Sequence, residues 1–219
     1  IVSRDWSSDV CSYDLYKDSE LEKAIQEHWY ASEKLDGIRV FWQPQPQPRL
    51  VTKHGNPVIA PQTWLSYLQK HFSEVTLDLE LCGYARNHPN YHNSYERAQD
   101  LLQAHNSSST LWQYAALYIL DLCDYTHTLA ERYKLLQQYM PHKAVTWLHL
   151  NPQTRITDLE QLKHLYLTVC QTQGEGLMLR PSHTLYRHNL HSQESRSRTH
   201  GLKWKFWMHY RVSYDEKKG

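Results

Sequence analysis

The sequence lacks several features that would assign it to a class at once. It has no excess of charge, because 24 Lys and Arg stand against 23 Asp and Glu, so composition alone does not indicate a nucleic-acid-binding protein. Its four cysteines are widely spaced, without a Cys-x-x-Cys pair, which argues against a zinc knuckle and a disulfide framework. His188 and His191 form an H-x-x-H pair, but the glutamate of the H-E-x-x-H zinc motif is missing.

Long apolar runs are also absent. No segment is apolar enough to cross a bilayer, and no basic start followed by an apolar core marks a secretory signal, so we expect no membrane partner. Residues 4–15, RDWSSDVCSYDL, closely resemble a translated sequencing-adapter read-through. We therefore interpret residues 1–15 as a non-native segment and expect the true start, with any signal region, to be missing.

What the sequence contains is typical of one globular domain. Of its 219 residues, 40% are hydrophobic and 21% are charged, and 8 Trp and 16 Tyr supply side chains for a core. The residue patterns predict helices over 19–28, 61–71, 91–104, 126–140 and 159–169, and strands within 29–42, 49–58, 75–84, 111–124, 144–150, 175–181 and 201–207. These elements interleave without regular β-α-β units, so we predict an α+β fold with antiparallel sheets.

A short charged motif opens one of the predicted strands. The stretch EKLDGIRVF, residues 33–41, sets Lys34 two residues before Asp36 and Arg39 two residues after Gly37. Taken alone, this motif is explained by a turn with a surface ion pair. That explanation weakens because other charged residues also lie on or beside predicted strands, where alternation aims them at one face. The full set is Lys34, Arg39, Glu80, Glu175, Lys203 and Lys205.

A face that combines lysines with carboxylates suits a nucleotide and its metal. A lysine amine attacks phosphorus only when deprotonated, which nearby positive charge from Arg39, Lys203 and Lys205 would favour. Paired lysines and Mg²⁺ also offset the charge that phosphoryl transfer builds on the non-bridging oxygens. Mg²⁺ binds a few carboxylate oxygens together with water, and Glu80 and Glu175 are the candidates.

Further motifs follow in a fixed order along the chain. Lys34-Leu-Asp36-Gly37-Ile-Arg39 resembles motif I of the covalent nucleotidyltransferases, the superfamily of ATP-dependent DNA ligases, RNA ligases and mRNA capping enzymes. VTKHGNP is similar to motif Ia, LDLELCG to motif III, YILDLCD to motif IIIa, EGLMLR to motif IV and LKWK to motif V. SEKLDGIRVFW and KHGNPVIAP most resemble the minimal bacterial ATP-dependent DNA ligases, many of which are exported to the periplasm. The resemblance implies an ATP-grasp-like nucleotidyltransferase (adenylation) domain over residues 16–211, with packed antiparallel sheets and flanking helices.

The resemblance also implies a role for each matching residue. Lys34 would take AMP from ATP as a lysyl-adenylate, and Asp36 would order the nick end and activate its 3′-hydroxyl. Arg39 would touch the ribose or the nick phosphate. The remaining implied contacts are Glu80 with the ribose hydroxyl and the metal, Glu175 with Mg²⁺, Lys203 and Lys205 with the α-phosphate, and Glu33, Leu35, Lys53, Tyr118 and Leu120 with the nucleotide. AMP would then pass to a DNA 5′-phosphate, so the expected partner of this monomer is nicked double-stranded DNA.

Three positions depart from the family pattern. Lys53 stands where motif Ia usually has arginine, which reduces a bidentate phosphate grip to a point charge. Leu79 replaces the glycine expected before the motif III glutamate. Leu120 occupies the place of the aromatic residue that stacks on adenine, and Tyr118, two residues away, is the candidate to substitute for it.

Some alternatives stay open at this point. We expect residues 212–219 to begin a truncated OB-fold domain, so that sealing would need the full-length enzyme while self-adenylation would not. The motifs are shared with RNA ligases and capping-type guanylyltransferases, and the departures also admit a nucleic-acid-binding module that no longer catalyses. The family resemblance favours the bacterial periplasm, with the cytoplasm as the alternative.

Overall fold

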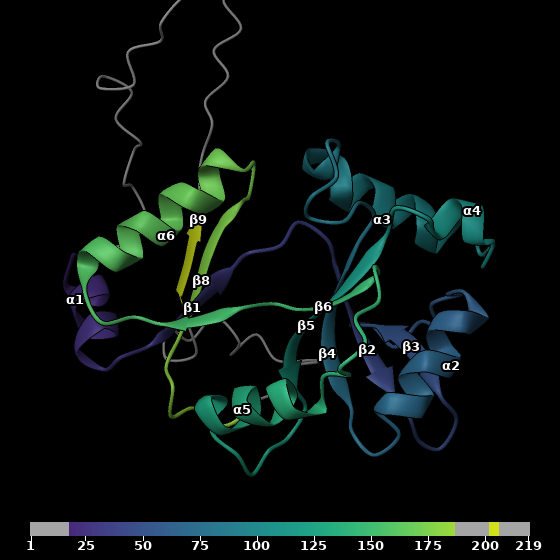
Figure 1. Ribbon diagram of the computed structural model, residues 1–219, viewed down its shortest axis with the longest axis horizontal. Helices are drawn as coiled ribbons and strands as arrows, with labels where there is room; N and C mark the ends of the chain where they lie inside the picture. Colours follow the sequence, from purple (N-terminus) through teal and green to yellow (C-terminus); the bar gives the residue numbers. More distant parts are fainter. Residues whose placement is uncertain (1–17, 187–201, 206–219) are drawn as a thin grey trace, which may run out of the picture.

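The chain folds into two β-sheets with helices packed around them (Figure 1). The computed structural model describes residues 18–186 and 202–205. One sheet has the strand order β7-β1-β8-β9 and is called the small sheet, and the other has the order β3-β2-β4-β5-β6 and is called the large sheet. The predicted α+β class is therefore confirmed. The segments predicted at 1–15 and 212–219 lie outside the described residues.

The small sheet is built around β1 (Tyr30–Glu33). This strand pairs with β7 (Gln153–Arg155) on one side and with β8 (Gly176–Arg180) on the other, and β9 (Leu202–Lys205) extends the sheet beyond β8. All of these pairs are antiparallel. Helices α1 (Asp18–Gln26) and α6 (Leu159–Gln171) bury Ala24, Leu162, Tyr166 and Val169 against Ala31, Leu177 and Leu179 of the sheet. The small sheet thus has its own apolar core.

The large sheet has the larger core. Its strands are β2 (Ile38–Gln43), β3 (Arg49–Thr52), β4 (Leu77–Cys82), β5 (Ala116–Leu122) and β6 (Leu148–Leu150). The helices around it are α2 (Gln62–His71), α3 (Ser94–Gln103), the short α4 (Ser109–Trp112), α5 (Leu129–Tyr139) and the 3₁₀ turn η1 (Tyr91–Asn93). Trp42, Leu79, Leu68, Leu101 and Trp112 are among its buried side chains. Every pair is antiparallel except β5–β6, which is parallel and so departs from the all-antiparallel prediction.

The charged motif lies where the chain passes from one sheet to the other. The predicted extended segment 29–42 is divided between β1 in the small sheet and β2 in the large sheet. Gly37 makes the crossing possible, because a Cβ atom there would lie 2.4 Å from the backbone oxygen of Leu81. Only a residue without a side chain lets the loop approach β4 so closely.

The predicted helices are confirmed, with local differences at other elements. Thr128 and Glu131 form a capping box at the start of α5, and Asp158 caps α6 by accepting from the Gln161 amide. The strand expected within 111–124 is shorter, because α4 takes its first residues. Strand β7 was not predicted, since its three residues carry no alternating apolar pattern.

Among residues 18–186 and 202–205, no helix has the length and apolar character needed to span a membrane. Cys82, Cys123 and Cys170 are free thiols.

Candidate active site

Lys34 lies at the point where the chain leaves the small sheet. Its backbone amide donates to the Gly176 oxygen at 2.8 Å, which continues the β1–β8 pairing by one residue. Its ammonium group forms an ion pair with Glu175, the residue that precedes β8. These side chains are only 20% and 24% exposed. Two residues predicted from separate motifs, 141 positions apart in sequence, are thus in contact.

Arg39 and two carboxylates share one face of the large sheet. Arg39 stands opposite Glu80 in the β2–β4 register and reaches diagonally to Asp78, with Nε–Oδ1 and Nη2–Oδ2 distances of 2.8 and 2.5 Å. The Tyr186 hydroxyl donates to Asp78 Oδ2 at 3.0 Å. Burial by itself lowers the pKa of Arg39, but the contact with Asp78 outweighs it and raises that pKa, so the guanidinium stays charged. Asp78 therefore fixes the direction of Arg39.

Glu80 is the partly buried carboxyl group between these residues and Lys34. Burial raises the pKa of Glu80 to about 8; Asp78 adds to the rise, whereas Lys34 and Arg39 oppose it. At neutral pH this side chain is therefore largely protonated. A positive charge brought close to it would favour the ionised form.

Asp121 links the two sheets. Arg132 on α5 donates to both carboxylate oxygens of Asp121, at 2.8 and 2.9 Å, and Arg180 at the end of β8 donates to Oδ2 at 2.8 Å. Arg180 also donates to the Leu120 oxygen at 3.1 Å. Asp121 and Arg132 are each 2% exposed. Because two guanidinium groups share one carboxylate, this cluster leaves a local excess of positive charge.

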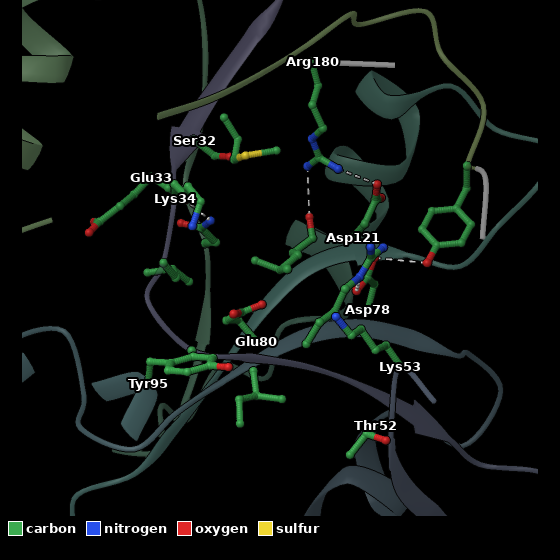
Figure 2. Close-up of a pocket in the computed structure, with 18 of the residues that line it drawn as sticks. Ser32, Glu33, Lys34, Thr52, Lys53, Asp78, Glu80, Tyr95, Asp121 and Arg180 are labelled. Atoms are coloured by element: carbon green, nitrogen blue, oxygen red, sulfur yellow. Dashed lines mark hydrogen bonds and ion pairs between the residues drawn. The ribbon is translucent and has the colours of Figure 1, made fainter. Parts of the chain in front are cut away.

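A cleft of about 830 Å³ is lined by residues of both sheets (Figure 2). The predicted site residues that line it are Glu33, Lys34, Leu35, Arg39, Lys53, Glu80 and Leu120. Figure 2 shows Lys34, Glu80 and the Arg180–Asp121 pair around the same space. Further residues that line the cleft had no predicted role in the site; they are Ser32, Asp78, Tyr95, Asp121, Arg132, Asn151, Met178, Arg180 and Tyr186.

Other predicted site residues are placed differently. Asp36 is not among the cleft-lining residues, and its amide donates to the Tyr91 hydroxyl at 3.1 Å. Lys203 and Lys205 lie on β9, where their backbones pair with Met178 and Gly176 of β8, while their side chains lie outside the described part of the structure. The roles assigned to these residues stay predictions.

Tyr118 does not line the cleft. It is 7% exposed, its ring stacks on His149 at a centroid distance of 5.0 Å, and its hydroxyl accepts from the Arg86 amide at 2.7 Å. Burial raises its pKa to about 12. Leu120, by contrast, does line the cleft. Adenine stacking by Tyr118 would therefore require its ring to leave both contacts, and that role stays a prediction.

The other departures from the motif pattern have simple structural explanations. Leu79 is fully buried in the large-sheet core, on the face of β4 opposite Asp78 and Glu80, so its side chain does not enter the cleft. Lys53 is an exposed residue of the turn after β3 that borders the cleft. Neither substitution blocks the site.

Some of the cleft-lining residues without a predicted role could have been identified from sequence patterns, and others could not. Asp78 shares the polar face of β4 with Glu80, so alternation alone could have identified it. Arg180 ends the strand predicted from EGLMLR. Asn151 and Tyr186 follow short or irregular segments, and no sequence pattern places them at the cleft.

A metal ion in this site would need carboxylate ligands. Within residues 18–186 and 202–205, no three or more His, Cys, Asp or Glu side chains come together as a metal cluster. His188 and His191 lie outside those ranges. Mg²⁺ commonly binds through one or two carboxylates, substrate phosphates and water, so Glu80 and Glu175 have suitable donor chemistry.

A two-sheet α+β domain, in which a cleft is lined by a strand-end lysine and an arginine-carboxylate pair, has the architecture of a nucleotidyltransferase domain. The family model of the ATP dependent DNA ligase domain matches residues 14–198, and the chain belongs to this family. The resemblance of the motifs to ATP-dependent DNA ligases is thereby confirmed.

Individual relatives agree with this assignment. A DNA ligase of Haemophilus influenzae is 28% identical over 167 residues, which cover 76% of this chain and 56% of the relative. A structure from a study of Lig E DNA ligases has a TM-score of 0.57 at 22% identity, over 82% of this chain and 62% of that chain. The Chlorella virus DNA ligase-adenylate has a TM-score of 0.58 at 16% identity, over 76% and 59% of the two chains. The chain thus spans little more than half the length of these proteins.

Proposed function

We propose that this chain is the adenylation part of an ATP-dependent DNA ligase. The observation that carries the proposal is the position of Lys34, which meets Glu175 at the small-sheet side of a cleft whose large-sheet side holds Glu80 and Arg39. Membership of the ligase family makes ATP the expected nucleotide.

In the proposed reaction, Lys34 attacks the α-phosphorus of ATP. The amine first gives up a proton to solvent. A bond then forms between Nζ and the α-phosphorus while the bond from that phosphorus to the bridging oxygen breaks, so pyrophosphate leaves. Arg39 and the two arginines at Asp121 provide fixed positive charge near the cleft, and they need no rearrangement during the reaction because Asp78 and Asp121 already hold them. Lys203 and Lys205 are proposed to contact the α-phosphate.

Mg²⁺ is a further part of the proposal. Glu80 and Glu175 would hold it, and the ion would offset negative charge on the phosphate oxygens. A cation beside Glu80 would also convert this carboxyl group from its protonated to its ionised form.

Transfer of AMP to a DNA 5′-phosphate and sealing of the nick are proposed for the longer protein. A monomer acting on nicked duplex DNA in the bacterial periplasm is the expectation carried over from the family resemblance. The cytoplasm stays the alternative compartment.

Intact mass spectrometry tests the proposal. The purified chain is incubated with Mg²⁺ and either ATP or GTP, beside a Lys34→Ala variant shown by circular dichroism to be folded. We expect a gain of one AMP with ATP in the wild type and no gain in the variant, because the variant lacks the nucleophilic amine. The variant should still fold, because a site lysine contributes little packing. Labelling by GTP alone would favour a capping-type enzyme, and a folded wild type without labelling would favour a binding module that does not catalyse.

A further inference from the structure

Arg86 lies outside every predicted motif role and contacts three separate segments. It belongs to the loop after β4, and its side chain is 21% exposed. Its Nε forms an ion pair with Glu33, the last residue of β1. Its Nη1 and Nη2 donate to the Thr172 backbone oxygen and hydroxyl, each at 2.5 Å, and Nη2 is 3.4 Å from the Val169 oxygen.

These contacts hold both sides of the Lys34–Glu175 pair. Glu33 directly precedes Lys34, and Thr172, the C-terminal cap of α6, lies on the short segment that leads to Glu175. That segment packs closely on Glu33, because a Cβ atom at Gly174 would lie 2.8 Å from Glu33 Oε1. Arg86 therefore ties the two segments together just behind the ion pair.

The loop beyond Lys34 is held by the same arginine. The Arg86 guanidinium lies over the Tyr91 ring, 4.7 Å from its centroid, and the Tyr91 hydroxyl accepts from the Asp36 amide at 3.1 Å. Contacts that depend on Arg86 thus flank Lys34 on both sides in the sequence.

Glu33 lines the cleft, but its carboxylate forms its ion pair with Arg86. In Figure 2 its side chain extends away from Asp78, Glu80 and Asp121. Burial raises the pKa of Glu33, and Arg86 opposes that rise. A partly buried carboxylate needs such a partner, and only the planar guanidinium can serve it and several oxygens of a helix end at once.

We infer that Arg86 is a positioning residue for adenylation, which sets the placement of Lys34 relative to Glu175 through Glu33 and Thr172. This inference rests on the proposed function. A misplacement of a reacting group by about 1 Å can cost roughly a hundredfold in rate, so the loss of this link should slow the chemical step more than it weakens nucleotide binding.

The test measures the rate of AMP uptake by the full chain against ATP concentration. Arg86→Met is expected to lower the saturating rate by at least about tenfold, with a change of less than about threefold in the half-saturating ATP concentration. Arg86→Lys keeps the positive charge but loses the planar guanidinium that contacts several oxygens at once, so it should give an intermediate rate. Glu33→Gln should also slow the reaction, and the double variant should lose less than the product of the two single losses.

Arg97→Met is the matched control. Arg97 on α3 is a half-buried arginine that donates to the Leu111 oxygen at 3.0 Å and does not line the cleft. Its loss should lower the melting temperature without changing the saturating rate of the folded protein.

The outcomes separate the two proposals. A wild type that takes up no AMP overturns the proposed function and, with it, the role of Arg86. A wild type that takes up AMP, beside a folded Arg86→Met variant of equal saturating rate, overturns only the positioning role. A rate loss equal to that of Arg97→Met, or multiplicative effects of Glu33→Gln and Arg86→Met, would also contradict it.

Discussion

The two sheets contribute to the cleft in different ways. The small sheet provides residues at strand ends, with Lys34 directly after β1 and Glu175 directly before β8. The large sheet provides residues within strands, where Arg39, Asp78 and Asp121 are held in buried or partly buried ion pairs. The proposed nucleophile therefore comes from strand ends, where a backbone hydrogen bond to Gly176 and the contacts of Arg86 hold it. The electrostatic support comes from strand interiors, where ion pairs hold the charged groups.

Two features of the chain connect the small sheet to the large sheet. Asp121 connects β5 of the large sheet to Arg180 of the small sheet, and Gly37 lets the crossing loop lie against β4. Substitutions at Gly37 and Asp121 should therefore change the rate of AMP uptake and the free energy of unfolding by different amounts.

The largest effect is expected from Gly37→Ala. The added Cβ would overlap the Leu81 backbone oxygen, so the loop that carries Lys34 must move away from β4. We expect the rate of AMP uptake to fall by at least about a hundredfold. Intact mass measured over time gives the rate.

Gly55→Ala is the control for that change. Gly55 has a φ of +83°, but no atom lies within 4 Å of an added Cβ, so the cost is backbone strain of about 1 kcal/mol rather than a collision. A Gly37→Ala variant that lost no more activity than Gly55→Ala would show that the close approach to β4 is unimportant.

A large effect on stability is expected from Asp121→Asn. The change leaves Arg132 and Arg180 without their shared counter-charge in a buried place, which should lower the free energy of unfolding by about 3 to 5 kcal/mol. Urea denaturation measures it. Glu160→Gln breaks an exposed ion pair with Lys163 and should change the same quantity by about 0.5 kcal/mol or less. Equal effects of the two substitutions would contradict the role assigned to Asp121.

A smaller, pH-dependent effect is expected from Glu80→Gln. Between pH 4.5 and about 8 the folded chain keeps a proton on Glu80 that the unfolded chain has lost, so the wild type loses stability as the pH rises through this range. The variant lacks this loss and should be more stable than the wild type by about 1 to 3 kcal/mol near pH 9, with little difference near pH 4. Urea denaturation of both proteins at these pH values checks the sign, and a constant difference across the range would refute the burial of this carboxyl group.

Local patterns predicted much of this structure. Residue patterns predicted the strand within 75–84 that contains β4 and the helix over 126–140 that contains α5. These features depend on neighbours in the sequence, which is why they could be predicted. The division of segment 29–42 between two sheets depends on pairing with β8 and β4, and no local pattern encodes those partners.

The candidate site was predicted to a similar extent. The ordered motifs predicted that Lys34, Arg39, Glu80 and Glu175 belong to one site. Lys34, Arg39 and Glu80 line the cleft and Glu175 contacts Lys34, while the roles of these residues stay predictions. Arg86 carried no such signal, since it is a single arginine in a loop whose partners lie 53, 83 and 86 residues away.

The central claim is that Lys34 is the residue that takes the nucleotide. The most direct measurement is peptide mapping by tandem mass spectrometry of the wild-type chain after incubation with ATP and Mg²⁺, under conditions that preserve a nitrogen–phosphorus bond. The account predicts one AMP, on the peptide that contains Lys34 and on that lysine. AMP on Lys203, Lys205 or any other residue would contradict it.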